Sequence, residues 1–245
     1  MIRLLHEVPA LDAGSLQVEG PAFHYLTRVL RLRVDDVLEV FDGHGHAWDA
    51  RVLTVEPELH RAGLSLGPAR TLPPLPPVTL LQGLPKGDKL ELVLQKSTEL
   101  GATRIWPVQC KRSVVQLSGE KGQKRAERWR RIVEEAARQC ERTDVPEVSE
   151  PIPVLEAASA LPLGTLLLVL DEEERETRLG QLLEARPDAP VALVIGPEGG
   201  LAREEVAALV SLGGVPVTLG SRILRTETAG LAALAVLQHL RGQLG

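Results

Sequence analysis

Cysteine, methionine and aromatic residues are scarce in this chain of 245 residues, and asparagine is absent. The two cysteines, Cys110 and Cys140, lack metal-site spacing, so we expect a reduced, cytoplasmic protein without a metal ion. Aromatic residues make up 2% of the chain, which argues against a surface that stacks many nucleic-acid bases. No apolar run approaches the roughly 20 residues of a membrane span, and we see no signal-peptide pattern.

Positive charge is in deficit over the whole chain, whose formal net charge is −5. The middle of the chain differs, because residues 71–145 hold 14 basic and 9 acidic side chains, a net charge of +5. Residues 1–70 carry a net charge of −3, and residues 146–245 carry −7. This distribution permits a local surface for a polyanion but does not require one.

Four prolines within Thr71-Leu-Pro-Pro-Leu-Pro-Pro77 predict a semi-rigid connector, because this stretch cannot continue a helix or an interior strand. Before it, the segments 37–41 and 47–55 flank a glycine-containing turn and predict a hairpin. Another strand is expected at 59–66 and a short helix at 22–30. Together these elements favour a small barrel ahead of the connector.

Strands and helices alternate after the connector. We expect strands at 78–81, 104–108, 165–170, 191–195 and 215–219, and helices at 89–100, 121–141, 203–212 and 228–240. This alternation is typical of an α/β domain in which helices cover a mainly parallel sheet.

Two glycine-containing stretches follow the last two predicted strands: Gly196-Pro-Glu-Gly-Gly200 and Leu219-Gly-Ser-Arg-Ile-Leu-Arg-Thr-Glu-Thr-Ala-Gly230. Neither is a Walker A loop or a dinucleotide-binding G-x-G-x-x-G pattern. Because open α/β sheets bind ligands at the carboxyl ends of their strands, we expect the functional site here. A purely structural turn remains an alternative for the first stretch, and helix capping for the second.

Other polar groups are less specific. His44 and His46 lie in a predicted turn without a third ligand, so exposed histidines are favoured over a metal site. The basic residues between 121 and 131 fit the solvated face of a helix, with phosphate contact as the alternative.

Six stretches, taken in order, resemble the RsmE family of bacterial small-subunit ribosomal RNA uridine-N3 methyltransferases, which belong to the SPOUT class. They are His24-Tyr-Leu-Thr-Arg-Val-Leu-Arg31, Lys86-Gly-Asp-Lys-Leu-Glu91, Gln95-Lys-Ser-Thr-Glu-Leu-Gly101, Glu135-Ala-Ala-Arg-Gln-Cys-Glu-Arg142, Ile195-Gly-Pro-Glu-Gly-Gly-Leu201 and Leu219-Gly-Ser-Arg-Ile-Leu-Arg-Thr-Glu-Thr-Ala229. They span nearly the whole chain. The acidic run at 171–174 is the only part that stands out against the resemblance.

The resemblance implies a PUA-like RNA-binding β-barrel at 1–70, a proline-rich linker at 71–77 and a SPOUT methyltransferase domain at 78–245. That domain is α/β, with a parallel sheet and a deep trefoil knot. The resemblance also implies a homodimer, S-adenosylmethionine as the cofactor, and small-subunit (16S) ribosomal RNA or the assembled small ribosomal subunit as the partner.

The same resemblance places the cofactor on three loops. The cofactor-binding residues it implies are Leu170, Ile195, Gly196, Pro197, Glu198, Gly199, Gly200, Leu219, Gly220, Ser221, Ile223 and Leu224. For catalysis we expect Arg225 to stabilise negative charge on the uracil, and Glu227 or Glu198 to accept the N3 proton. A water molecule or the RNA itself is an alternative acceptor. The expected RNA contacts are Arg3, His24, Arg28, Arg31, Arg33, Lys86, Lys111 and Arg112.

Two alternatives to uridine-N3 methylation stay open. One is a methyltransferase of the same class that acts on another RNA nucleotide. The other is a non-catalytic ribosome-assembly protein that binds RNA and has no working cofactor pocket. Cofactor binding distinguishes the second alternative, and the identity of the methylated base distinguishes the first.

Overall fold

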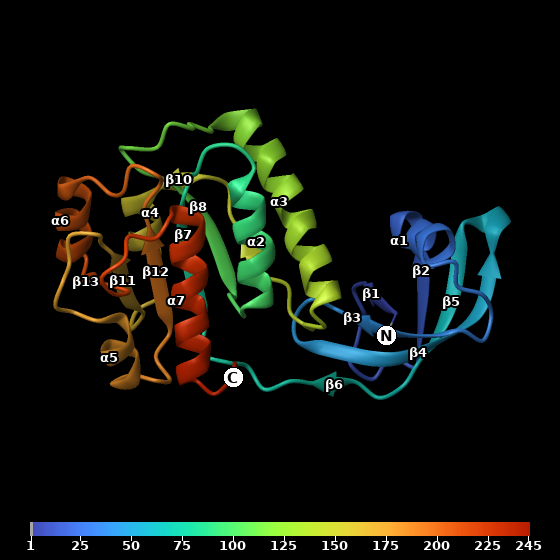
Figure 1. The fold of residues 1–245 in the computed structure, drawn as a ribbon. Coiled ribbons are helices and arrows are strands. Elements are labelled where there is room, and N and C mark those ends of the chain that lie inside the picture. Colours follow the sequence, from blue (N-terminus) through green and yellow to red (C-terminus); the bar gives the residue numbers. More distant parts are fainter. Residues whose placement is uncertain (1) are drawn as a thin grey trace. The chain divides into compact units, whose positions relative to one another are not determined.

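The structure, a computed structural model, describes residues 2–245 and divides into two compact units (Figure 1). The first unit extends to Pro74 and also includes Ala137–Val145, and the second consists of Leu75–Ala136 and Pro146–Gly245. The first boundary falls within the proline-rich stretch at residues 71–77. None of the helices in the described residues combines the length and apolar character that crossing a membrane requires.

The first unit contains one six-stranded sheet with the order β1-β3-β4-β5-β2, in which β6 pairs with β4. Its strands β1 and β3 are parallel, and its other pairs are antiparallel. The predicted hairpin is confirmed as β3 and β4. The strands are β1 (Arg3–Leu5), β2 (Ser15–Glu19), β3 (Val37–Phe41), β4 (His46–Glu56), β5 (Arg61–Leu66) and β6 (Arg70–Thr71).

Alternating burial along these strands forms the core of the first unit. In β5, Ala62, Leu64 and Leu66 are buried while the residues between them are partly exposed, as the period of a strand requires. The helix expected at 22–30 is present as α1 (Gly20–His24) and a following π-helical turn, η1 (Tyr25–Val29). A short 3-10 turn, η2 (Pro57–Leu59), precedes β5.

The second unit contains the predicted parallel sheet, with the order β10-β8-β7-β12-β11-β13 and with β9 beside β8. All of its strand pairs are parallel. Strand β11 lies between β12 and β13 and is parallel to both. The loops that follow these three strands therefore leave the sheet at the same edge. The strands are β7 (Val78–Gly83), β8 (Arg104–Gln109), β9 (Glu147–Val148), β10 (Ile152–Pro153), β11 (Leu166–Leu170), β12 (Val191–Ile195) and β13 (Val215–Val217).

Helices cover the parallel sheet on both faces (Figure 1). Helix α7 contacts β7, β12, α2 and α5, whereas α4 contacts β7, β8 and α6. The sequence did not predict α4, α5, β9 or β10, because segments of two to six residues are too short to show a period. The helices are α2 (Lys89–Glu99), α3 (Gly119–Gln139), α4 (Val154–Ser159), α5 (Leu179–Glu184), α6 (Arg203–Ser211) and α7 (Thr226–Leu240).

Arg3 is an internal connector of the first unit rather than a surface residue. Its Nε donates to Glu39 Oε1 at 2.5 Å, and its Nη1 donates to the backbone oxygens of Ala137 and Arg142 at 3.2 and 2.9 Å. The Arg3 residue is only 5% exposed. Arg3 was expected to contact RNA, but its guanidinium instead satisfies carbonyls at and just after the C-terminal end of α3 and is shielded from solvent.

Two arginines that share one carboxylate allow a direct test of this role. Arg70 Nη2 also donates to Glu39, at 2.5 Å, but its side chain is 51% exposed against 3% for Arg3. We expect Arg3→Met to lower the free energy of unfolding by about 3 kcal/mol or more, because it leaves buried polar groups unpaired. Arg70→Met should lower it by about 1 kcal/mol or less. Urea unfolding followed by circular dichroism measures both, and equal losses would contradict the internal role of Arg3.

Candidate active site

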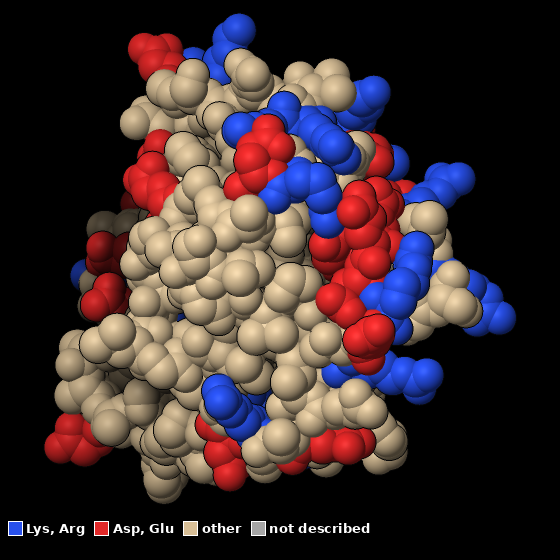
Figure 2. Space-filling view, turned by 90° about the vertical axis from the view of Figure 1, so that its left-hand side faces the viewer, with Lys and Arg blue, Asp and Glu red and all other residues tan. Residues whose placement is uncertain are grey.

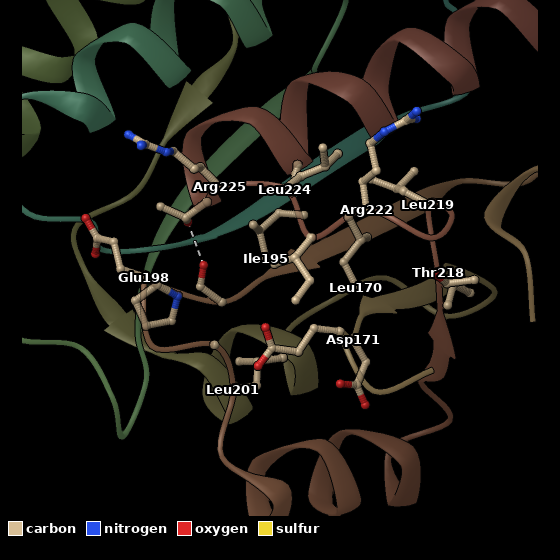
Figure 3. A pocket seen from close by; sticks show the side chains of 18 of the residues that line it. Leu170, Asp171, Ile195, Glu198, Leu201, Thr218, Leu219, Arg222, Leu224 and Arg225 are labelled. Carbon is tan, nitrogen blue, oxygen red and sulfur yellow. Dashed lines mark hydrogen bonds between the residues drawn. The ribbon is translucent and has the colours of Figure 1, made fainter. Parts of the chain in front are cut away.

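The loops at the carboxyl ends of the parallel strands border one cavity of about 390 Å³ (Figure 3). Apolar side chains from the ends of β11 and β12 and from the loop after β13 form its walls, among them Leu170, Ile195 and Leu224. Ten of the twelve predicted cofactor residues line it, and Gly199 and Ser221 lie on the same loops without lining it. The ten are Leu170, Ile195, Gly196, Pro197, Glu198, Gly200, Leu219, Gly220, Ile223 and Leu224.

Glycine is required where these loops approach one another. A Cβ on Gly83 would lie 2.6 Å from Pro197 N and 2.8 Å from Ile195 O. A Cβ on Gly196 would lie 2.8 Å from Leu201 N, and Gly200 has a φ of +69°. The loop after β12 therefore folds tightly on itself and against the end of β7, because no side chain intervenes.

A buried chain of hydrogen bonds joins three elements beneath the cavity. Gln82 Nε2 donates to Thr226 Oγ1 at 2.9 Å. Thr226 Oγ1 in turn donates to the Gly196 carbonyl at 2.6 Å, the bond that is dashed in Figure 3. Gln82 is fully buried, and Thr226 is 6% exposed. The end of β7, the first turn of α7 and the loop after β12 are thereby held in one arrangement.

The loop between β13 and α7 offers unpartnered backbone donors. The N–H groups of residues 221–224 donate no hydrogen bond among the described residues, and the side chains of Ile223 and Leu224 line the cavity. Exposed donors of this kind pair with ligand oxygens or ring nitrogens without the help of side chains. Gly220, with a φ of +127°, allows the chain to turn into this loop.

Arg225, the N-cap residue of α7, is exposed and lines the cavity. Its guanidinium has no hydrogen-bond or ion-pair partner within residues 2–245. The positive charge is therefore available to a ligand.

The two predicted proton acceptors differ in their positions. Glu198 lines the cavity, accepts from the Lys86 N–H at 3.0 Å and lies 3.1 Å from Lys89 Nζ. Partial burial raises the pKa of Glu198. The hydrogen bond from the Lys86 N–H and the Lys89 ammonium together lower it by more than burial raises it, so the pKa lies below its usual value. Glu227 does not line the cavity, and its Oε2 lies 3.3 Å from Lys89 Nζ.

An acidic segment after β11 forms the opposite rim. Arg203 pairs with both oxygens of Asp171 at 2.7 and 2.8 Å, and this pair lowers the pKa of Asp171. Both residues line the cavity, as does Glu172. The acidic run that stood out in the sequence is thus part of the site.

Sequence reasoning missed half of the cavity lining. Only the acidic run at 171–174 and the matched stretches gave a signal for some of these positions. The missed residues are Lys89, Asp171, Glu172, Arg175, Leu201, Arg203, Val217, Thr218, Arg222, Thr226 and Ala229.

The predicted RNA contacts fall into separate groups. His24, Arg28, Arg31 and Arg33 are exposed in the first unit, and Lys86 is exposed in the second. Lys111 and Arg112 are exposed too, but each is already paired. Their partners are Glu204, at 2.8 Å, and the Gly199 carbonyl, at 2.9 Å.

One face of the molecule is a poor match for a polyanion. On the side of α6, acidic and basic side chains are interleaved around a broad uncharged area (Figure 2).

His46, which the sequence analysis weighed as a metal ligand, pairs with a carboxylate: its Nδ1 lies 2.6 Å from Asp42 Oδ2. No group of three or more potential metal ligands is found among residues 2–245.

The cavity residues fit S-adenosylmethionine. The volume falls within the range of small-molecule sites, roughly 300–1,000 Å³. Apolar walls suit the adenine ring, and the unpartnered N–H groups at 221–224 suit its nitrogens or the ribose and carboxylate oxygens. Of the three carboxylates that line the cavity, Glu172 is in no ion pair within residues 2–245, and its charge suits a cationic sulfonium.

Comparison with known proteins agrees with this geometry. A family model described as an RNA methyltransferase domain matches residues 72–238, and one described as an RNA methyltransferase PUA domain matches residues 18–58. The chain is 37% identical, over 97% of its length and 92% of the relative, to a protein from Mycobacterium bovis named ribosomal RNA small subunit methyltransferase E.

Two solved structures extend the comparison. One is a ribosomal RNA small subunit methyltransferase E from Neisseria gonorrhoeae bound to S-adenosylmethionine, with a TM-score of 0.85, 36% identity and 98% of each chain covered. The other is a Legionella pneumophila chain in complex with the same cofactor, with a TM-score of 0.80, 31% identity and 97% of each chain covered. The chain therefore belongs to the ribosomal RNA small subunit methyltransferase E family, with a PUA-like domain ahead of an α/β RNA methyltransferase domain.

Proposed function

We propose that this chain transfers the methyl group of S-adenosylmethionine to N3 of one uridine in small-subunit ribosomal RNA. The observation that carries the proposal is the cavity at the strand ends, which combines apolar walls, unpartnered backbone donors and a free arginine. A non-catalytic RNA-binding role is disfavoured, because such a role gives no reason to maintain this cavity.

The cofactor is held by the three loops after β11, β12 and β13. Bound there, it supplies a methyl group on a sulfonium that requires no further activation. What remains for the protein is to align N3 with that methyl group, to exclude water and to manage the departing N3 proton.

We assign the stabilising charge to Arg225 and the proton-accepting role to Glu198. As the N3–H bond breaks, negative charge spreads onto the uracil oxygens, and a free guanidinium at the cavity stabilises it. Glu198 remains ionised at neutral pH, which is the form that accepts a proton. Glu227 is less suited to that step, because it does not line the cavity.

For RNA binding we propose the exposed basic residues of the first unit, Arg28, Arg31 and Arg33, together with His24 and Lys86. Lys111 and Arg112 are secondary contacts, because RNA would have to replace their present partners. Arg3 is left out of this surface because it is buried.

We further propose that the chain works as a cytoplasmic homodimer and that its three cofactor loops form a trefoil knot. Exposed apolar side chains support the dimer: Ile223 is 73% exposed on a cofactor loop, and Val236 is 38% exposed on α7. Sedimentation equilibrium should give twice the chain mass of 26.5 kDa, and a monomer would contradict the dimer. An experimentally determined structure that traces residues 166–224 would show whether the chain forms the knot.

The reaction itself is tested with purified protein, tritiated S-adenosylmethionine and small ribosomal subunits that lack native methylation. We expect label in a single nucleoside, identified by mass spectrometry as 3-methyluridine. Label in another nucleoside would move the substrate to a different base. Tight cofactor binding without any label would leave the pocket intact and overturn the proposed substrate.

The close approach at Gly83 predicts an effect on the cofactor pocket. Gly83→Ala pushes the backbone at 195–197 outward, so we expect cofactor affinity to fall about tenfold, equal to about 1.4 kcal/mol. Gly180→Ala is the matched control, because its Cβ would meet no atom within 4 Å and it lies inside helix α5. That control should bind normally and gain about 0.5–1 kcal/mol of stability. Calorimetric titration with S-adenosylmethionine measures both variants.

The free guanidinium predicts a defect in chemistry rather than in binding. Arg225→Ala should lower kcat about 100-fold or more, since one charge-stabilising donor is lost, with cofactor affinity within about twofold of wild type. Single-turnover methyl transfer under saturating cofactor and RNA measures this. Near-normal turnover with unchanged cofactor binding would show that the electrostatic role belongs to another group.

A further inference from the structure

Lys89, the first residue of α2, joins two carboxylates that come from distant parts of the sequence. Its Nζ lies 3.1 Å from Glu198 Oε1, on the loop after β12, and 3.3 Å from Glu227 Oε2, in the first turn of α7. The Lys89 side chain is 36% exposed, and it lines the cavity. One ammonium therefore connects α2, the cofactor loop and the helix that begins after Arg225.

The two carboxylates depend on Lys89 to different degrees. Glu198 also accepts a hydrogen bond from the Lys86 N–H at 3.0 Å, so it keeps one donor without Lys89. Glu227 Oε2 is buried and has no hydrogen-bond partner among the described residues, so the Lys89 ammonium is the only positive charge paired with it. Without that ammonium, two carboxylates would face each other with little compensation.

We propose that Lys89 is a positioning residue of the methyl-transfer site, which holds Glu198 at the cavity and fixes the turn of α7 that carries Arg225. The proposal rests on the proposed function, because it assigns Lys89 a part in the same reaction. Lys89 acts through its neighbours: it sets the place of the proton acceptor and of the free guanidinium together. Loss of this link misplaces both groups, and misplacement by about 1 Å can cost about 100-fold in rate.

The charge balance around Lys89 agrees with this role. The hydrogen bond to Glu198 raises the pKa of Lys89, against a lowering by desolvation, so the ammonium stays charged at neutral pH. Removing it should raise the pKa of Glu198, because the Lys86 N–H is then the only remaining donor to its carboxylate from another residue. Other charged groups lining the same cavity are Asp171, Glu172, Arg175, Arg203, Arg222 and Arg225.

The test compares Lys89→Met and Lys89→Arg with a matched control, Lys96→Met. Lys96 lies on the same helix and pairs with Glu99 at 2.8 Å, and it does not line the cavity. We expect Lys89→Met to lower kcat about 10- to 100-fold, and Lys89→Arg to recover most of that loss. Cofactor affinity should change less than threefold, and the Lys96→Met control should match wild type.

The pH dependence separates positioning from a general loss of structure. In Lys89→Met the acidic limb of the kcat profile should move to higher pH, because Glu198 protonates more readily there. A merely structural role would lower kcat equally at every pH.

A second measurement does not depend on activity. Carbon-13 labelled glutamate carboxyls can be titrated by NMR, with a Glu198→Gln spectrum identifying the Glu198 signal. The pKa of Glu198 should rise in Lys89→Met and stay near wild type in Lys89→Arg and Lys96→Met.

Failure of this inference is distinct from failure of the proposed function. If wild-type protein forms no 3-methyluridine, the proposed function is wrong, whereas the NMR titration still tests the charge link. If wild type is active and Lys89→Met keeps both its kcat and its Glu198 titration, Lys89 is not a positioning residue.

Discussion

The site depends on one contact between backbones. At the end of β7, Gly83 lies so close to residues 195–197 that a single Cβ would come within 2.6 Å of Pro197 N. A contact of this kind admits only one relative position of the two strand ends, because main-chain atoms cannot rotate aside as a flexible side chain does. The loop after β12 leaves the sheet in a fixed direction for that reason.

Polar groups then extend this rigidity outward. Beneath the cavity, Gln82 and Thr226 connect the same two strand ends to α7 by hydrogen bonds that are shielded from water. At the cavity mouth, Lys89 connects α2 to the loop and to α7 by charge. The first link is buried and the second is partly exposed, so the floor of the site should be stiffer than its mouth.

The sequence predicted the elements that have a long period or a strong boundary. Five of the seven strands of the parallel sheet and the four longest helices were expected within a few residues, and the carboxyl ends of those strands were expected to carry the site. The RNA methyltransferase family was expected from the resemblance, not from periodicity. The order of the strands was not predictable, because nothing local indicates that β11 lies between β12 and β13.

The missed site residues share a physical reason. Lys89 and Thr226 lie more than 130 positions apart, and the packing of α2 against α7 beside the paired β7 and β12 brings both to one cavity. Arg3 illustrates the opposite error: it was expected to contact RNA, but a buried carboxylate and carbonyls at the end of α3 hold it inside. Charge in a sequence indicates which side chains need partners, and tertiary structure decides whether those partners are water, protein or ligand.

The same distinction explains how a chain of net charge −5 can act on RNA. Phosphate binding depends on cations that are free to displace counterions, and not on the total charge of the protein. Internal partners already pair with the side chains of Arg3, Lys111, Arg112 and Arg203. The side chains of Arg28, Arg31 and Arg33 are exposed and have no ion-pair partner within residues 2–245. Affinity for RNA should therefore come from a few local cations rather than from the net charge of the chain.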